Sequence, residues 1–134
     1  MGLFPEYSHA IASLAVWALI VIVLSGVSIS GKAVARCDCG KPRRDYADPV
    51  YRRDRAFQNA LETSAPFLAA TIAAILAGAP PFWVNLMASI FVVSRVAMAV
   101  VHIGTEIQPL RSAFYGISWL CILVTAILTF VAVF

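Results

Sequence analysis

The chain has 134 residues, of which 61% are hydrophobic and 13% are charged, and its mean hydropathy is +0.86. Soluble globular domains carry roughly a quarter of charged residues, so this composition excludes an ordinary soluble domain. The formal net charge of +3 does not indicate nucleic-acid binding, because eight of the ten basic residues gather in one segment, from Lys32 to Arg55.

Four long apolar stretches predict four transmembrane helices, over about residues 9–31, 54–78, 82–104 and 111–134. At roughly 1.5 Å per residue, a helix of about 20 residues crosses a hydrocarbon core of about 30 Å. The stretches lack the alternating pattern of a transmembrane β-barrel. We therefore expect an all-α integral membrane protein, a four-transmembrane-helix bundle that forms one membrane domain over residues 1–134.

The first apolar stretch does not have the pattern of a cleavable signal peptide. No Lys or Arg precedes Lys32, and the apolar run is longer than the hydrophobic region of such a signal. The basic segment fills most of the loop over about residues 32–53, and the positive-inside rule predicts that this loop is cytoplasmic. Both termini then lie on the opposite side, in a bacterial inner membrane or the endoplasmic reticulum.

Three cysteines are present, two in the basic loop (Cys37 and Cys39) and one in the last apolar stretch (Cys121). A structural zinc site needs four ligands, usually from two pairs, and the sequence has no second pair. We therefore expect no metal. A cytoplasmic loop predicts that Cys37 and Cys39 are reduced thiols.

A polar stripe opens the second apolar stretch, in the sequence "RAFQNALE" at residues 55–62. The spacing of Arg55, Gln58, Asn59 and Glu62 puts the four side chains on one face of a helix. This face is expected to meet something polar at the cytoplasmic end of the bundle.

Arg95 lies deep in the third apolar stretch, where a charge is costly and should face the bundle interior with a partner. Glu62 lies at a matching depth, so we expect a Glu62–Arg95 pair, which can be a purely structural contact between two helices. His102 lies at the cytoplasmic end of the same stretch. A single His at such a position is more typical of a hydrogen-bonded interface residue than of a catalyst.

Arg111, Ser112 and Tyr115 open the fourth apolar stretch, with Arg111 and Tyr115 on one face. An Arg at a helix N-terminus adds its charge to free backbone N–H groups, and together they favour an anion. The alternative is an Arg that reaches the membrane surface beside an interfacial Tyr. The spacing alone does not decide between the two.

Three segments occur in a characteristic order: "RAFQNALETSAPF", then "SRVAMAVVHIG", then "PLRSAFY". Over about residues 48–118 this pattern resembles the MAPEG family, the membrane-associated proteins of eicosanoid and glutathione metabolism. The nearest branch resembles the microsomal glutathione transferases and the microsomal prostaglandin E synthase. The resemblance implies a four-helix protomer, a homotrimer, and a glutathione site at each subunit interface that opens to the cytoplasm.

The resemblance also implies roles for individual residues. Glutathione would be held by residues of the second, third and fourth apolar stretches: Arg55, Asn59, Glu62, His102 and Tyr115. Arg111 and Ser112 match the pair that lies near the glutathione sulfur, which makes them the catalytic candidates. The sequence departs from the family pattern around Ser28, where several members have an Arg, at Gln58 (Arg in some members), at Met98 (polar or aromatic in some) and at His102 (Tyr in several).

We therefore expect a membrane-bound, glutathione-dependent transferase, with possible peroxidase activity, acting on an apolar electrophile or a lipid hydroperoxide. The thiolate is the reactive form of glutathione, and an Arg charge with a hydroxyl donor would stabilise it. The alternative is a non-catalytic, lipid-binding membrane scaffold of the same family. A small transporter or channel is less consistent with a single buried Arg that has an internal partner.

Overall fold

The computed structural model describes residues 3–32 and 35–134. It contains a short 3-10 helix, η1 (Pro5–Tyr7), followed by four α-helices: α1 (Ser8–Ser28), α2 (Pro49–Leu76), α3 (Pro81–Gly104) and α4 (Gln108–Val133). All four α-helices are long and apolar enough to cross a membrane. The predicted all-α, four-helix membrane architecture is confirmed.

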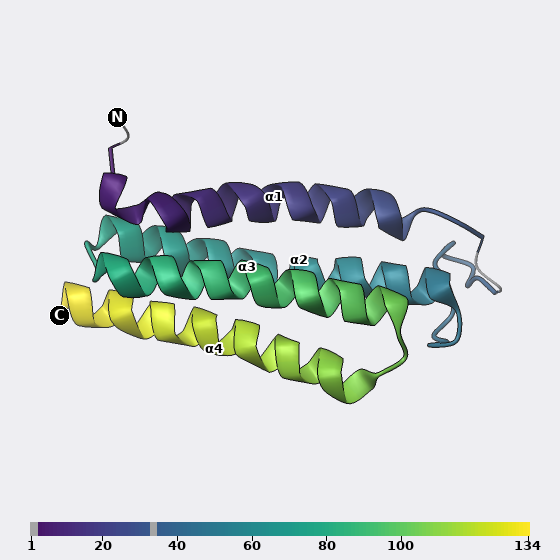
Figure 1. Cartoon of the computed structure of the whole chain (residues 1–134). Helices are drawn as coiled ribbons and strands as arrows, with labels where there is room; N and C mark the ends of the chain where they lie inside the picture. The colour runs from purple at the N-terminus through teal and green to yellow at the C-terminus, as the bar shows by residue number, and fades with distance from the viewer. Residues whose placement is uncertain (1–2, 33–34) are drawn as a thin grey trace.

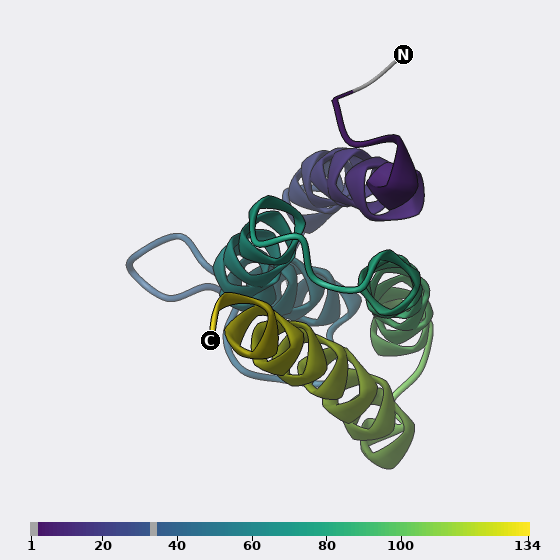
Figure 2. The same cartoon turned by 90° about the vertical axis from the view of Figure 1, so that its left-hand side faces the viewer.

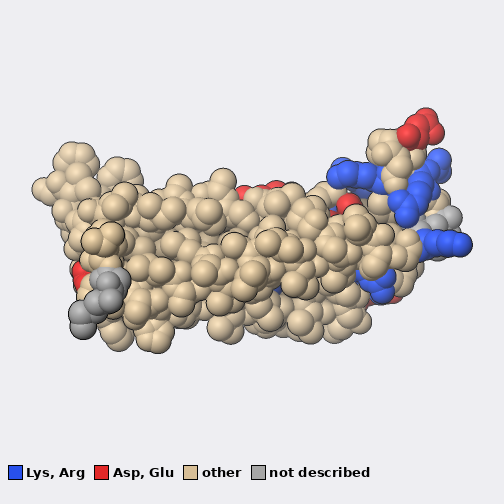
Figure 3. Space-filling view, turned by 90° about the horizontal axis from the view of Figure 1, so that it is seen from above, with Lys and Arg blue, Asp and Glu red and all other residues tan. Residues whose placement is uncertain are grey.

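The four helices run side by side along the length of the molecule (Figures 1 and 2). Both termini and the α2–α3 turn lie at one end, and the α1–α2 loop and the α3–α4 connection lie at the other (Figure 1). We refer to the second as the loop end. Lys and Arg side chains gather there, while the long middle of the same face is almost entirely uncharged (Figure 3).

Helix α2 begins at Pro49, before the expected start at about residue 54. The Asp48 side chain accepts a hydrogen bond from the backbone N–H of Val50 at 2.9 Å, which is the usual N-cap contact. Pro49 takes the first helical position, where its missing N–H costs nothing. Arg52 and Arg53 therefore lie on the helix and not in the loop expected over about residues 32–53.

Two other helix ends differ from the expected bounds. Helix α1 ends at Ser28 instead of about residue 31. Helix α4 begins at Gln108, before the expected residue 111. Arg111 therefore lies in the first turn of α4, and its backbone N–H bonds to the carbonyl oxygen of Ile107 at 3.4 Å instead of pointing freely at an anion.

Aromatic side chains form the centre of the bundle. The rings of Phe67 and Phe91 stack with centroids 3.8 Å apart, and Trp17 meets Phe91 edge-on at 5.2 Å. The Trp17 indole N–H donates to Ser64 Oγ at 3.0 Å, so its polar atom is satisfied inside the bundle. These contacts join α1, α2 and α3 in the middle of the bundle.

Candidate functional site

A cavity of about 270 Å³ lies between α2, α3 and α4 towards the loop end. We refer to it as the helical cavity. Its lining comes from the α1–α2 loop and three helices: Tyr46, Arg55, Asn59, Glu62, Met98, Arg111, Ser112 and Tyr115. Six of the seven residues that the sequence indicated as site residues therefore meet in one place, and His102 is the exception.

Arg55 is held by three acceptors on its own helix. Its Nη1 donates to Gln58 Oε1 at 2.8 Å, and its Nη2 donates to Asn59 Oδ1 at 3.4 Å. The Glu62 carboxylate lies 3.6 Å from Arg55 Nη1, and the Glu62 side chain is 51% exposed. The polar stripe thus forms a continuous network along α2, and it keeps a half-exposed carboxylate available at the cavity wall.

Arg111 reaches across from α4 to the loop. Its guanidinium donates to the Tyr46 hydroxyl and lies with Cζ 5.4 Å from the centroid of the Tyr46 ring. A cation over an aromatic face is attracted by the ring quadrupole. Tyr46 therefore holds the Arg111 guanidinium in position.

The expected Glu62–Arg95 pair is wrong. In the part of the chain that the structure describes, Arg95 forms no ion pair, and Glu62 pairs with Arg55. Arg95 Nη2 donates instead to the backbone carbonyl of Asn59, and its Nη1 lies 3.0 Å from Met98 Sδ. Matching depth along two helices was not sufficient, because the half-exposed Glu62 pairs with Arg55 on its own helix, whereas Arg95 is buried.

Arg95 is surrounded by aromatic faces. Its Cζ lies 5.8 Å from the Trp17 ring and 5.6 Å from the Tyr115 ring. Tyr115 also lines the helical cavity. Arg95 therefore supports the inner wall of the cavity from behind, through the Asn59 backbone and the Tyr115 ring.

His102 lies beside the cavity without lining it. The residue is 2% exposed, and its Nδ1 lies 3.5 Å from Asn59 Nδ2. Its ring stacks loosely on Tyr46, with centroids 6.0 Å apart. Among the described residues, His102 Nε2 has no hydrogen-bond partner. His102 can therefore orient Asn59 and Tyr46, but it does not reach the cavity space.

A second, larger cavity of about 770 Å³ lies under the α1–α2 loop, and we refer to it as the loop cavity. It is lined by loop and α2 residues: Cys37, Cys39, Lys41, Pro42, Arg43, Arg44, Tyr46, Tyr51, Asp54, Arg55 and Gln58. Tyr46 and Arg55 line both cavities, so the two share a wall.

The expectation of reduced loop thiols is also wrong for this structure, because Cys37 and Cys39 form a disulfide. Cys121 is free and buried in α4. Within residues 3–32 and 35–134, no three His, Cys, Asp or Glu side chains are grouped so that they could hold a metal ion.

Two residues that line the helical cavity, Met98 and Tyr46, were not among the predicted site residues, and Tyr46 had the weaker signal in the sequence. It lies in an irregular loop, where no periodicity ties it to a helix face. Its position depends on Arg52, whose Nη1 donates to the Tyr46 carbonyl and whose Nε donates to the carbonyl of Ile103 at 3.3 Å. The one signal for Tyr46 in the sequence was its position, as an aromatic residue two positions before the Asp48 cap of α2.

A comparison with protein-family models matches residues 7–131 of this chain to the MAPEG family. A search of curated proteins finds no match. The family match and the four membrane-spanning helices describe an integral, multi-pass membrane protein with a function related to glutathione or to eicosanoids. Since the match covers nearly the whole chain, the protein belongs to the MAPEG family.

Proposed function

We propose that the protein is a membrane-bound, glutathione-dependent transferase, and that it also reduces lipid hydroperoxides with glutathione. The observation that carries this proposal is the meeting of Arg55, Asn59, Glu62, Arg111 and Ser112 in the helical cavity. Arg55, Asn59 and Glu62 lie on α2, Arg111 and Ser112 lie on α4, and the fold brings the two groups together around one cavity. The resemblance to the microsomal glutathione transferase branch points in the same direction.

The charges of the cavity suit glutathione, which carries two carboxylates, one ammonium and a thiol. Arg55 and Arg111 offer planar guanidinium groups, which bind carboxylates or a thiolate strongly. Glu62 offers a half-exposed carboxylate for the ammonium. On binding, Arg55 would exchange some of its contacts on α2 for contacts with the ligand.

Arg111 and Ser112 are the residues that we propose to act on the sulfur. A free thiol has a pKa of about 8.5, so little thiolate is present at neutral pH without stabilisation. The Arg111 charge would favour the thiolate by Coulomb attraction, and the Ser112 hydroxyl would donate a hydrogen bond to it. Tyr46 keeps Arg111 on the loop side of the cavity until the ligand arrives.

The stabilised thiolate can follow two reactions. With an apolar electrophile, sulfur forms a bond to carbon and the leaving group departs with its electron pair. With a lipid hydroperoxide, sulfur attacks the outer oxygen, the O–O bond breaks, and the lipid alcohol leaves after taking up a proton. The sulfur keeps the outer oxygen, so glutathione becomes a sulfenic acid. This sulfenic acid then condenses with a second glutathione to give glutathione disulfide and water.

A neighbouring copy of the chain would complete the site. The helical cavity of about 270 Å³ is slightly smaller than the range of about 300–1,000 Å³ that is usual for ligand sites. The homotrimer implied by the family resemblance would add a further wall, and we propose this assembly. We also propose that the loop end faces the cytoplasm, since the basic residues gather there.

Conjugation of glutathione to a small apolar electrophile, such as a chlorodinitrobenzene, tests the proposal on the purified protein in detergent. Arg111→Ala should lower kcat/KM by roughly 10²–10³, the usual cost of removing a charge-stabilising donor. Arg53→Ala is the matched control, because Arg53 lies on α2 and donates to the Ser30 carbonyl outside the helical cavity. Absence of turnover in the parent protein across several electrophiles and hydroperoxides would contradict the proposal.

A lipid-binding scaffold is the second candidate function. An apolar groove of about 580 Å³ runs between α1 and α3, lined by side chains such as Leu19, Val23, Val96 and Val100. This groove fits an acyl chain. Retention of a defined lipid through purification, without any effect of glutathione, would favour this function over the first.

A further inference from the structure

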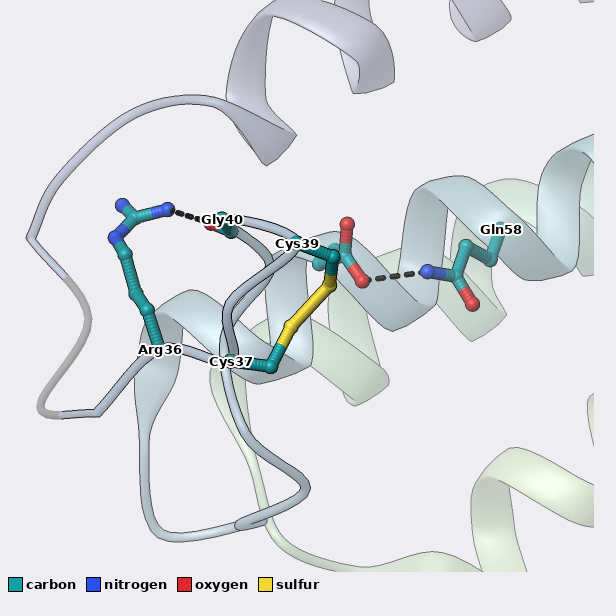
Figure 4. Close-up of a disulfide and its surroundings, with 6 residues drawn as sticks. Arg36, Cys37, Cys39, Gly40 and Gln58 are labelled. Atoms are coloured by element: carbon teal, nitrogen blue, oxygen red, sulfur yellow. Dashed lines mark hydrogen bonds between the residues drawn. A yellow bond between two sulfur atoms is a disulfide. The ribbon is translucent and has the colours of Figure 1, made fainter.

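The Cys37–Cys39 disulfide lies in a tight turn of the α1–α2 loop (Figure 4). The Gly40 N–H donates to the Cys37 carbonyl at 2.9 Å, and the Cys37 N–H donates to the Lys41 carbonyl at 2.9 Å. The Arg36 side chain donates to the Gly40 carbonyl at 2.6 Å. The turn is therefore held by hydrogen bonds that do not involve sulfur.

This disulfide is poorly suited to a structural role. It joins residues only two positions apart, and a disulfide restricts the unfolded chain least when the loop that it closes is short. The backbone bonds of the turn remain available when the sulfur–sulfur bond opens. A bond that adds little constraint and can open without unfolding its surroundings suits reversible chemistry.

The surroundings of the disulfide favour thiol exchange. Cys39 is exposed and Cys37 is partly exposed. Both line the loop cavity, together with the cations Lys41, Arg43 and Arg44. Exchange proceeds by attack of a thiolate on a disulfide sulfur, and nearby cations both stabilise thiolates and attract anionic thiols.

The loop cavity also adjoins the proposed glutathione site. Arg55 and Tyr46 form the wall that the two cavities share. Figure 4 shows the disulfide next to the α2 segment that carries Gln58, whose amide donates to Asp54 Oδ2 at 2.6 Å. A thiol that reaches the loop end would therefore meet the disulfide next to the proposed glutathione site.

The charge of the loop and its disulfide indicate different compartments, unless the disulfide is reversible. The basic residues favour a cytoplasmic loop. Disulfides in the cytoplasm are rare and are usually transient, catalytic or redox-sensing. A redox-active pair satisfies both observations.

We propose that Cys37 and Cys39 form a redox-active pair that exchanges with an anionic, low-molecular-weight thiol of the glutathione class. A glutathione thiolate attacks one sulfur, breaks the S–S bond and leaves a mixed disulfide and a cysteine thiolate, which takes up a proton. A second glutathione thiolate attacks the glutathione sulfur of the mixed disulfide. The products are the protein dithiol and glutathione disulfide, and two electrons pass from the two glutathione molecules to the pair.

The test uses the full-length protein in detergent, equilibrated with a series of glutathione to glutathione disulfide ratios. Free thiols are trapped with a maleimide, and the protein mass is measured. At the reducing end, two more thiols should be trapped than at the oxidising end. Cys37→Ser and Cys39→Ser should each carry one glutathione adduct in glutathione disulfide, while Cys121→Ser should behave as the parent protein, because Cys121 is buried in α4.

A charge variant tests the preference for an anionic thiol. Arg43→Gln combined with Arg44→Gln should slow reduction by glutathione several-fold, and should slow reduction by mercaptoethanol much less, because the mercaptoethanol thiolate carries no further negative charge. Equal slowing of both reductants, or no slowing of either, would overturn this part of the proposal. A Cys37–Cys39 pair that stays oxidised throughout the glutathione series, but opens with dithiothreitol, would overturn the whole proposal. Free Cys37 and Cys39 thiols at the oxidising end would overturn it as well.

The inference goes beyond the proposed function and shares with it only the presence of glutathione at the loop end. The variant with both Cys37→Ser and Cys39→Ser should retain conjugation of apolar electrophiles. Exchange without conjugation in the parent protein would defeat the proposed function alone. Conjugation without exchange would defeat this inference alone.

Discussion

Arg95 shows how this bundle holds a charge without a carboxylate beside it. The residue is 3% exposed and lies in a helix long and apolar enough to cross a membrane. A backbone carbonyl, a thioether sulfur and two aromatic faces surround the guanidinium. Such contacts disperse a positive charge, and they account for an Arg inside a hydrophobic segment.

A double-mutant cycle tests the separation of Arg95 from Glu62. Arg95→Leu and Glu62→Gln should show only a small coupling energy in the free energy of unfolding, because the two side chains do not contact each other directly. The measurement is unfolding of each single and double variant in mixed detergent micelles.

The matched cycle combines Arg95→Leu with Tyr115→Leu. Arg95 Cζ lies 5.6 Å from the Tyr115 ring, and a desolvated cation–aromatic contact contributes about 0.5–2 kcal/mol. This second coupling energy should therefore exceed the first. A larger coupling for Glu62 than for Tyr115 would restore the ion pair that the sequence predicted.

At the scale of elements, α2 carries most of the site, and its first turn depends on the Asp48 cap. Asp48→Ala should lower the free energy of unfolding by about 0.5–2 kcal/mol, the usual cost of losing an N-cap acceptor. Asp45→Ala is the control, because Asp45 is an exposed loop residue whose carboxylate accepts from the Ala47 N–H.

Asp45→Ala should change the free energy of unfolding by no more than about 0.5 kcal/mol, as is usual for surface positions. Chemical unfolding monitored by helical circular dichroism compares the two variants. Equal effects of both substitutions would show that the N-cap contact does not stabilise α2.

How much the sequence could predict depends on the element. Arg55, Asn59 and Glu62 lie on one helix, so their spacing alone placed them on a common face. Tyr46 lies in a loop whose path is fixed by Arg52, through bonds to carbonyls of the loop and of α3. No local pattern reports such a long-range contact, so the sequence could not indicate Tyr46.

The same distinction explains the two wrong expectations. The Glu62–Arg95 pair was predicted from depth along two helices, and depth does not fix which way each side chain points around its helix. The reduced state of the Cys37 and Cys39 thiols was predicted from the cytoplasmic compartment of the loop. The compartment alone does not decide whether two thiols so close in the chain form a disulfide. Both errors concern relations between elements or with solvent, which helical periodicity does not encode.

At the scale of the whole molecule, the protein is polarised along its length. Lys and Arg side chains gather at the loop end (Figure 3). The loop cavity and the helical cavity lie towards the same end, and exposed apolar side chains occur on all four α-helices. A water-soluble anionic thiol can approach from the loop end, while an apolar substrate can approach through the hydrocarbon. The proposed function needs both routes to meet at Arg111 and Ser112.

Glutathione binding is the central claim, and the most direct measurement is thermal unfolding of the purified protein with increasing glutathione. A ligand that binds the native state at 100 times its Kd adds about 2.7 kcal/mol of stability. The account predicts a saturable rise in Tm for the parent protein and for Arg53→Ala, and a much smaller rise for Arg55→Ala and Arg111→Ala. No rise in the parent protein, or an equal rise in all four proteins, would contradict it.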